Sequence, residues 1–161
     1  MTISLTPYLW YSKDDVEAAH FYTSIIPGSH IKRISALQVE SPSGPPGSVK
    51  VVEFVLAGRP INAFAARAHH EGFNDAISLM LECDTQEEMD RLWSAFTENG
   101  GREVECGWLI DRYGLRWQIT PRVLADMTAD QNKAKAEAAT NVMLGSKKLN
   151  IAELTKAYEA A

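Results

Sequence analysis

Hydrophobic residues repeat with helical spacing twice along the chain, each time after an apolar stretch that favours a strand. Residues 3–11 are rich in β-forming side chains and predict the first strand. The apolar residues that follow have the i, i+3, i+4, i+7 spacing of a helix with one buried face: Ala18, Phe21, Tyr22 and Ile25. Asp14 with Glu17 predicts a capping box at the start of this helix, and Gly28 predicts its end.

Three further strands are predicted before residue 67. Residues 30–39 alternate as a strand does, and residues 41–47 have the Ser, Pro and Gly composition of a loop. Residues 49–57 and 61–66 flank a turn at Gly58 and predict a β-hairpin. The first part of the chain therefore has the order β-α-β-β-β.

The same order begins again at residue 76. Residues 76–83 predict a strand, and Thr85 with Glu88 predicts a second capping box. The next apolar residues repeat the helical spacing: Met89, Leu92, Trp93 and Phe96. Residues 102–106, 108–112 and 115–120 then predict three short strands.

The two parts match as a repeat. A shift of 71 positions brings the apolar residues of the first helix onto those of the second, and a shift of 56 brings Asn62 onto Gln118. The alternative is chance similarity between two ordinary α+β segments. We predict one α+β domain over residues 1–161 with tandem βαβββ modules at 3–66 and 74–120.

The last forty or so residues, 121–161, break the repeat and predict a helical tail. Pro121 suits a first helical turn, residues 128–144 favour a helix, and Asn150 is a helix-capping residue. We expect these helices to pack across the sheets or onto a second subunit.

Composition narrows the class of protein. The chain has 161 residues, 45% of them hydrophobic, and a net charge of −5, values of an acidic globular domain. This charge argues against nucleic acid as a partner, and the sequence shows neither an export signal nor an apolar stretch of membrane-spanning length, so no membrane partner is expected. Cys83 and Cys106 form no CxxC motif, which fits a cytoplasmic location.

Several motifs resemble the PhnB-like branch of the vicinal oxygen chelate superfamily, often labelled 3-demethylubiquinone-9 3-methyltransferase-like. The superfamily includes glyoxalase I, extradiol dioxygenases and bleomycin-resistance proteins. The motifs lie at residues 6–11, 18–22, 52–54, 73–78, 83–88 and 106–121. The resemblance implies tandem βαβββ modules and a homodimer. One departure is the loop after the fourth strand, where Phe64-Ala65-Ala66-Arg67-Ala68 replaces the branch's Phe-Asn-Gly-Gly-Pro.

The resemblance also implies four metal-ligand positions, one on the first and one on the fourth strand of each module. They fall on Pro7, Asn62, Ser78 and Gln118. Divalent catalytic metals prefer imidazole, thiolate or carboxylate ligands, so we expect no metal and no other cofactor. His69-His70 could bind a stray metal, although adjacent loop histidines are more often solvated.

Strand alternation predicts a cavity that binds a small-molecule ligand. Its expected walls are Leu9, Tyr11, Phe64 and Trp108, and its expected polar groups are Glu53, Asn62, Ser78 and Gln118. Glu53 is the candidate catalytic acid or base. The alternatives are a cross-strand pair of Glu53 with Arg33, Arg59 or Lys50, and amide side chains that only satisfy each other.

Three functions remain open from the sequence. The first is a metal-independent enzyme that uses Glu53, and the second is a protein that sequesters an aromatic drug or metabolite. The third is methyl transfer, for which the sequence lacks a glycine-rich strand-to-helix loop. Cys106 could be a nucleophile, but a structural thiol is the simpler interpretation.

Overall fold

The computed structural model describes residues 3–66 and 71–161. The chain divides into two compact units, Met1–Phe73 and Asn74–Ala161, and each is described by itself. His69-His70, considered above as a metal binder, lies outside the described residues.

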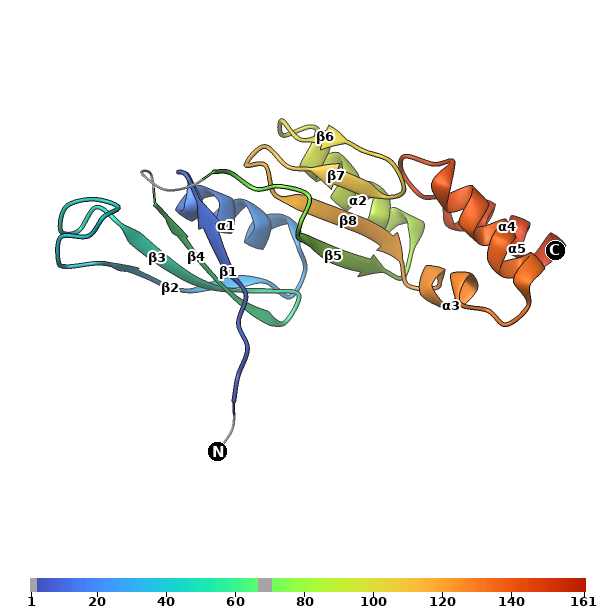
Figure 1. Ribbon diagram of the computed structural model, residues 1–161, viewed down its shortest axis with the longest axis horizontal. Coiled ribbons are helices and arrows are strands. Elements are labelled where there is room, and N and C mark those ends of the chain that lie inside the picture. Colours follow the sequence, from blue (N-terminus) through green and yellow to red (C-terminus); the bar gives the residue numbers. More distant parts are fainter. Residues whose placement is uncertain (1–2, 67–70) are drawn as a thin grey trace. The chain divides into compact units, whose positions relative to one another are not determined.

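The first unit is a four-stranded sheet with one helix (Figure 1). Strand β1 is parallel to β4, and the pairs β4–β3 and β3–β2 are antiparallel, which gives the order β1-β4-β3-β2. Its elements are β1 (Tyr8–Tyr11), α1 (Asp15–Ile25), β2 (His30–Ala36), β3 (Lys50–Leu56) and β4 (Arg59–Ala65).

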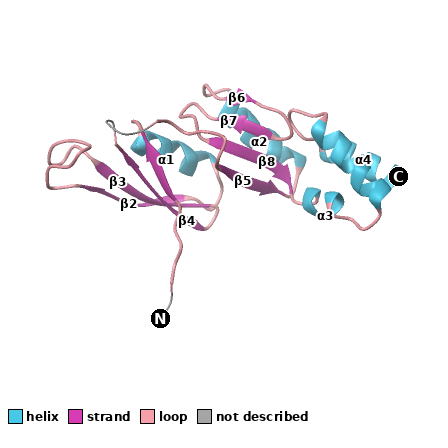
Figure 2. Ribbon diagram, in the orientation of Figure 1, coloured by secondary structure: helices cyan, strands magenta, loops and turns pink. Residues whose placement is uncertain are grey.

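The second unit repeats this topology, as Figure 2 shows in its strands and helices. Its sheet has the order β5-β8-β7-β6, and β5 is parallel to β8. Its elements are β5 (Ser78–Cys83), α2 (Gln86–Thr97), β6 (Arg102–Glu103), β7 (Trp108–Ile110) and β8 (Arg116–Pro121). The predicted tandem βαβββ modules are confirmed.

Each core lies between the helix and one face of its own sheet. In the first unit Ala18 and Tyr22 of α1 are fully buried, as are Val52 and Ala63 of the sheet. In the second unit the four predicted apolar positions of α2 are all buried: Met89, Leu92, Trp93 and Phe96. The opposite face of each sheet therefore carries the more exposed side chains.

The two predicted capping boxes have different outcomes. Thr85 accepts a hydrogen bond from the backbone N–H of Glu88, and the Glu88 carboxylate accepts one from the backbone of Thr85. The box expected at Asp14 is wrong, because this residue has a left-handed φ of 65° and its side chain caps nothing. A capping side chain reaches the first helical N–H groups from extended backbone, as at Thr85.

Three helices form the C-terminal tail: α3 (Leu124–Thr128), α4 (Lys133–Leu144) and α5 (Ile151–Ala160). Pro121 is the last residue of β8, so its predicted place in a first helical turn is wrong. The side chain of Asn150 does cap α5, because it accepts a hydrogen bond from the backbone N–H of Glu153 at 3.1 Å. None of the described helices is long and apolar enough to span a membrane.

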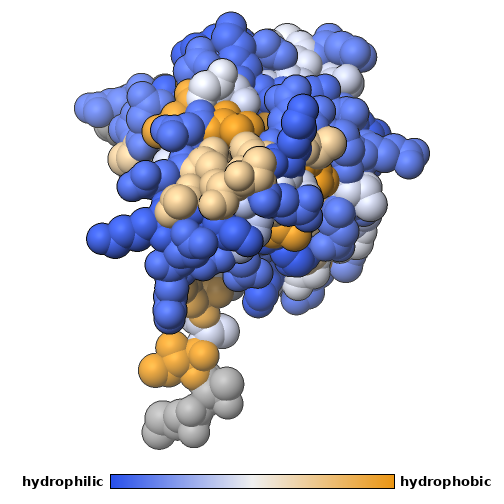
Figure 3. Space-filling view, turned by 90° about the vertical axis from the view of Figure 1, so that its right-hand side faces the viewer, coloured by the Kyte–Doolittle hydropathy of each residue, from blue (hydrophilic) through white to orange (hydrophobic). Residues whose placement is uncertain are grey.

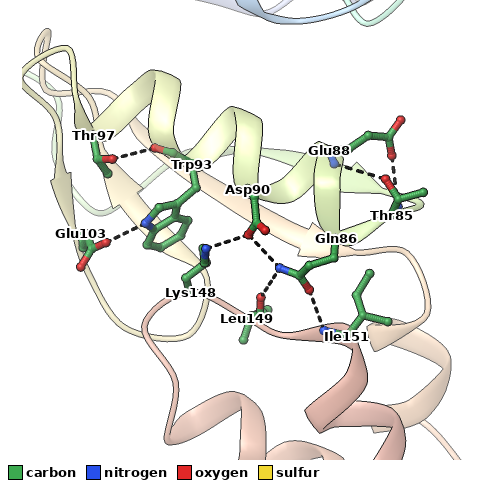
Figure 4. Close-up of polar contacts among 10 residues, drawn as sticks. All are labelled: Thr85, Gln86, Glu88, Asp90, Trp93, Thr97, Glu103, Lys148, Leu149 and Ile151. Atoms are coloured by element: carbon green, nitrogen blue, oxygen red, sulfur yellow. Dashed lines mark hydrogen bonds and ion pairs between the residues drawn. The ribbon is translucent and has the colours of Figure 1, made fainter.

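Polar contacts hold the segment between α4 and α5 against α2 (Figure 4). The amide of Gln86 donates to the carbonyl of Leu149 at 3.3 Å and accepts from the N–H of Ile151 at 2.9 Å. Lys148 reaches the Asp90 carboxylate at 2.7 Å. The tail is thereby an integral part of the second unit.

Leu149 is the apolar centre of this anchor. Its side chain is fully buried, and its terminal carbon lies 3.0 Å from where a Cβ on Gly107 would be. Gly107 has a φ of +81°, and its N–H donates to the carbonyl of Lys147 at 2.7 Å. Only glycine combines this backbone conformation with so close an approach.

Candidate functional site

The face of the first sheet that does not pack on its helix collects the candidate side chains. Residues opposite each other on neighbouring strands share a face. Tyr8 lies opposite Asn62, Trp10 lies opposite Phe64, and Glu53 lies opposite Asn62. We call the face formed by these five residues the open face of the first sheet.

Three rings on this face form an aromatic cluster, which consists of Tyr8, Trp10 and Phe64. The ring of Phe64 lies 5.4 Å from that of Tyr8, edge to face, and 4.9 Å from that of Trp10. Tyr8 is 49% exposed and Trp10 is 44% exposed. Large aromatic side chains gathered at the surface are typical of binding sites.

Leu9 and Tyr11, the residues expected to line the cavity, lie instead in the core of the first unit. Leu9 is 4% exposed and Tyr11 is 2% exposed, and the Tyr11 hydroxyl donates to that of Tyr22 at 3.2 Å. Four consecutive residues of β1 are large and apolar, so its alternation does not show which pair faces inward. The open face carries Tyr8 and Trp10 instead, and their pairing with β4 is the signal that identifies them.

Glu53 is engaged in a cross-strand ion pair. The Arg33 side chain donates to the Glu53 carboxylate from Nε at 3.0 Å and also from Nη2. Arg33 lies opposite Glu53 in the register between β2 and β3, which selects it among the three partners considered. The Glu53 side chain is 22% exposed, so the ion pair is partly screened from water.

Tyr8 shares the open face with this carboxylate, on the other side of Asn62. Partial burial raises the pKa of the Tyr8 phenol, and the nearby negative charge of Glu53 raises it further. The protonated hydroxyl can donate a hydrogen bond to a ligand. The open face therefore combines apolar rings with a phenol, an amide and an ion pair.

The corresponding face of the second sheet is more polar. Gln118 donates a hydrogen bond from Nε2 to the Ser78 hydroxyl at 2.8 Å, so these two predicted site residues satisfy each other. Trp108 is half-buried and lies opposite Gln118, as Glu53 lies opposite Asn62 in the first sheet. The repeat thus places an indole where the first module has a carboxylate.

The donors at the implied metal positions do not fit a divalent catalytic metal. The register places Tyr8, and not Pro7, opposite Asn62. The donors at these positions are then the phenol of Tyr8, the amides of Asn62 and Gln118 and the hydroxyl of Ser78, which are weak neutral ligands. In the part of the chain that the structure describes, no three His, Cys, Asp or Glu residues are grouped as a metal site.

The two cysteines have different surroundings. Burial, followed by the negative charge of Glu88, raises the pKa of the Cys83 thiol to about 11. Cys106 is half-buried, and its sulfur lies 3.9 Å from the carbonyl oxygen of Leu144. Both thiols are free.

Comparisons with known proteins agree with this fold. The family model described as 3-demethylubiquinone-9 3-methyltransferase matches residues 3–120. A PhnB protein of Bacillus cereus, described as a putative 3-demethylubiquinone-9 3-methyltransferase, is 30% identical. That match covers 74% of this chain and 99% of the other, with a TM-score of 0.65. The helical tail at 121–161 lies outside the residues matched by the family model.

More distant solved structures share the fold alone. A protein of Pseudomonas aeruginosa is 21% identical over 74% of this chain and 98% of its own, with a TM-score of 0.58. The fosfomycin resistance protein FosX of Mesorhizobium loti is 12% identical over 81% of this chain and 100% of its own, with a TM-score of 0.55. No curated protein matches the sequence.

Proposed function

The chain belongs to the 3-demethylubiquinone-9 3-methyltransferase, or PhnB-like, family of the vicinal oxygen chelate fold, and we propose that it binds a small organic molecule on the open face of its first sheet without a divalent metal. The observation that carries this proposal is the exposed aromatic cluster beside the Arg33–Glu53 ion pair. The rings offer stacking area, and the polar groups around them orient the ligand. A planar aromatic compound fits this combination.

The ion pair supports binding as the main role. Two donors of Arg33 occupy the Glu53 carboxylate, so this carboxylate is engaged in a cross-strand contact within the sheet. Glu53 and Arg33 then act as a fixed donor and acceptor pair at the edge of the aromatic cluster.

Acid–base turnover by Glu53 is the second candidate function. The observation that favours it is that Tyr8 and Glu53 share the open face, one on each side of Asn62, so that a ligand above Asn62 could exchange protons with both an acid and a base. Glu53→Gln separates the two functions. Lost turnover with retained affinity for a ligand found in the purified protein supports an enzyme, whereas unchanged behaviour supports a binding protein.

Methyl transfer, the activity in the family's description, is not part of the proposal. The three strand-to-helix loops read Ser12-Lys13-Asp14, Asp84-Thr85 and Arg122-Val123, and none of them offers the glycine-rich cradle of an adenosyl nucleotide. Micromolar binding of S-adenosylmethionine in a calorimeter would reverse this conclusion.

We further propose a cytoplasmic homodimer. Strand β1 is an edge of its sheet, and the residues before it expose Ile3 by 95% and Leu5 by 91%. In Figure 3 the stretch before β1 shows apolar side chains in orange at the surface. Exposed apolar groups at a sheet edge favour association. Sedimentation equilibrium would show a dimer, and a monomer at all concentrations would contradict this part.

The binding proposal is tested by fluorescence titration with 1-naphthol, a planar aromatic probe. Phe64→Ala removes the ring that contacts both others, and the expected loss is about 1–2 kcal/mol, or roughly five- to thirtyfold in affinity. Leu37→Ala, a 38% exposed apolar residue after β2, is the control and should bind like the wild type. Equal affinity in the Phe64 variant would refute the assignment of the open face.

A further inference from the structure

A pocket of about 280 Å³ lies on the other side of the first sheet, at the start of α1. Val49 and Ala65 form part of its apolar lining, and Ala65 lies opposite the core residue Tyr11. The helix side of the sheet therefore contributes to this pocket, and the aromatic cluster does not. The loop between β2 and β3 contributes Ser43 and Ser48.

Charges of both signs line the pocket: Lys13, Lys50, Asp14 and Asp15. Asp15 is 7% exposed, so its carboxylate lies among protein atoms. Lys13 and Asp14 form an exposed ion pair at 3.6 Å. Exposed ion pairs contribute little free energy, so replacing this one by contacts with a ligand costs little. The Lys50 ammonium donates to the carbonyl of Gly47 at 3.0 Å, and an ammonium has three protons to donate.

We propose that this pocket binds a small zwitterion, a molecule of amino-acid size with one ammonium and one carboxylate group. Two lysines beside two aspartates give a neutral lining, which matches a neutral ligand with separated charges. An ion of a single sign meets repulsion from two of the four groups. The pocket volume is below roughly 300 Å³, the lower end of the range for drug-sized ligands, so the pocket suits a smaller molecule.

In this assignment the carboxylate of the ligand contacts Lys13 and Lys50, and its ammonium contacts Asp14 and Asp15. The serine hydroxyls offer further hydrogen bonds to either end. The site is separate from the proposed aromatic ligand site, so each proposal can fail without the other.

The test uses L-alanine and γ-aminobutyrate as probes, with amide chemical shifts of the full chain as the readout. We expect saturable shifts at residues 13–15 and 43–50. Propionate and ethylamine, which each carry one of alanine's charges, should not saturate. A lack of saturable shifts with both zwitterions, or equal binding of a singly charged probe, would overturn the proposal.

Two variants remove single charges with little risk to the fold. Asp14→Asn keeps a residue that tolerates the left-handed φ of 65°, and Lys50→Gln keeps a long polar side chain. Each should weaken zwitterion binding roughly tenfold, the effect of losing a hydrogen bond to a charged group. Glu17→Gln on α1 is the matched control and should bind normally. Phe64→Ala should also bind normally, and wild-type affinity in both charge variants would refute the site.

Discussion

Truncation of Leu149 tests whether the C-terminal tail stabilises the second unit. This residue is fully buried between the tail and the backbone at Gly107. On either side of it, the Gln86 amide and the Asp90 carboxylate fix the tail by hydrogen bonds, so the surrounding structure has little freedom to collapse into the space left by a smaller side chain. Leu149→Ala should therefore leave a cavity in the anchor.

The expected cost is about 2–5 kcal/mol, the range for removing a buried leucine side chain with partial relaxation. That is a large share of the roughly 5–15 kcal/mol by which a domain is stable. The assay is urea unfolding followed by tryptophan fluorescence, which reports mainly on the second unit because it contains three of the four tryptophans, Trp93, Trp108 and Trp117.

Leu144→Ala is the matched control, because this leucine is 58% exposed near the end of α4. The free energy of unfolding of this control variant should differ from that of the wild type by at most about 0.5 kcal/mol. If Leu149→Ala were no more destabilising than this control, the tail would not be anchored as described.

Three further predictions concern the anchor and the open face. Gly107→Ala should destabilise the protein more than Gly58→Ala in urea unfolding. Both glycines have a φ near +80°, a conformation in which an alanine is strained by about 1–2 kcal/mol. Of the two, only Gly107 would also place the new Cβ in a clash, 2.9 Å from the carbonyl oxygen of Ile119. The Lys148 ammonium and then the Gln86 amide lower the pKa of Asp90. Its contribution to stability is present above the ordinary Asp pKa of about 3.9 and is lost as the pH falls through the lowered value. A carboxyl NMR titration in which Lys148→Ala left that pKa unchanged would contradict the contact. For Tyr8, Glu53→Gln should lower the raised pKa of the phenol, although burial, its larger cause, should keep it above about 10. The Tyr8 contribution to stability is complete below that ordinary value and is lost as the pH rises through the raised one. Ring NMR titration measures the change, and an unaltered pKa would place Glu53 too far from Tyr8.

The sequence predicts the repeated topology because the spacing of apolar residues identifies the buried face of each helix. Met89, Leu92, Trp93 and Phe96 have helical spacing and are all buried. In β4, Ile61 and Ala63 alternate with Asn62 and Phe64, and the first two are buried whereas the last two are half-buried. Strong periodicity of this kind reflects a face that must leave water.

Other features depend on contacts that local patterns do not contain. Tyr8, Leu9, Trp10 and Tyr11 are all large and apolar, so only pairing with β4 decides which side each faces. The choice of Arg33 as the partner of Glu53 likewise follows from strand register. The tail anchor joins residues 63 positions apart through the Gln86 amide, a contact for which the sequence has no local signal.

The central claim is that the aromatic cluster binds a small organic ligand without a metal. A titration of chelator-treated protein with 1-naphthol, wild type and Phe64→Ala side by side, tests it most directly. We predict saturable binding by the metal-free wild type and an affinity roughly five- to thirtyfold lower for the variant. Binding that appeared only after a divalent metal was restored, or that was equal in the two proteins, would contradict the claim.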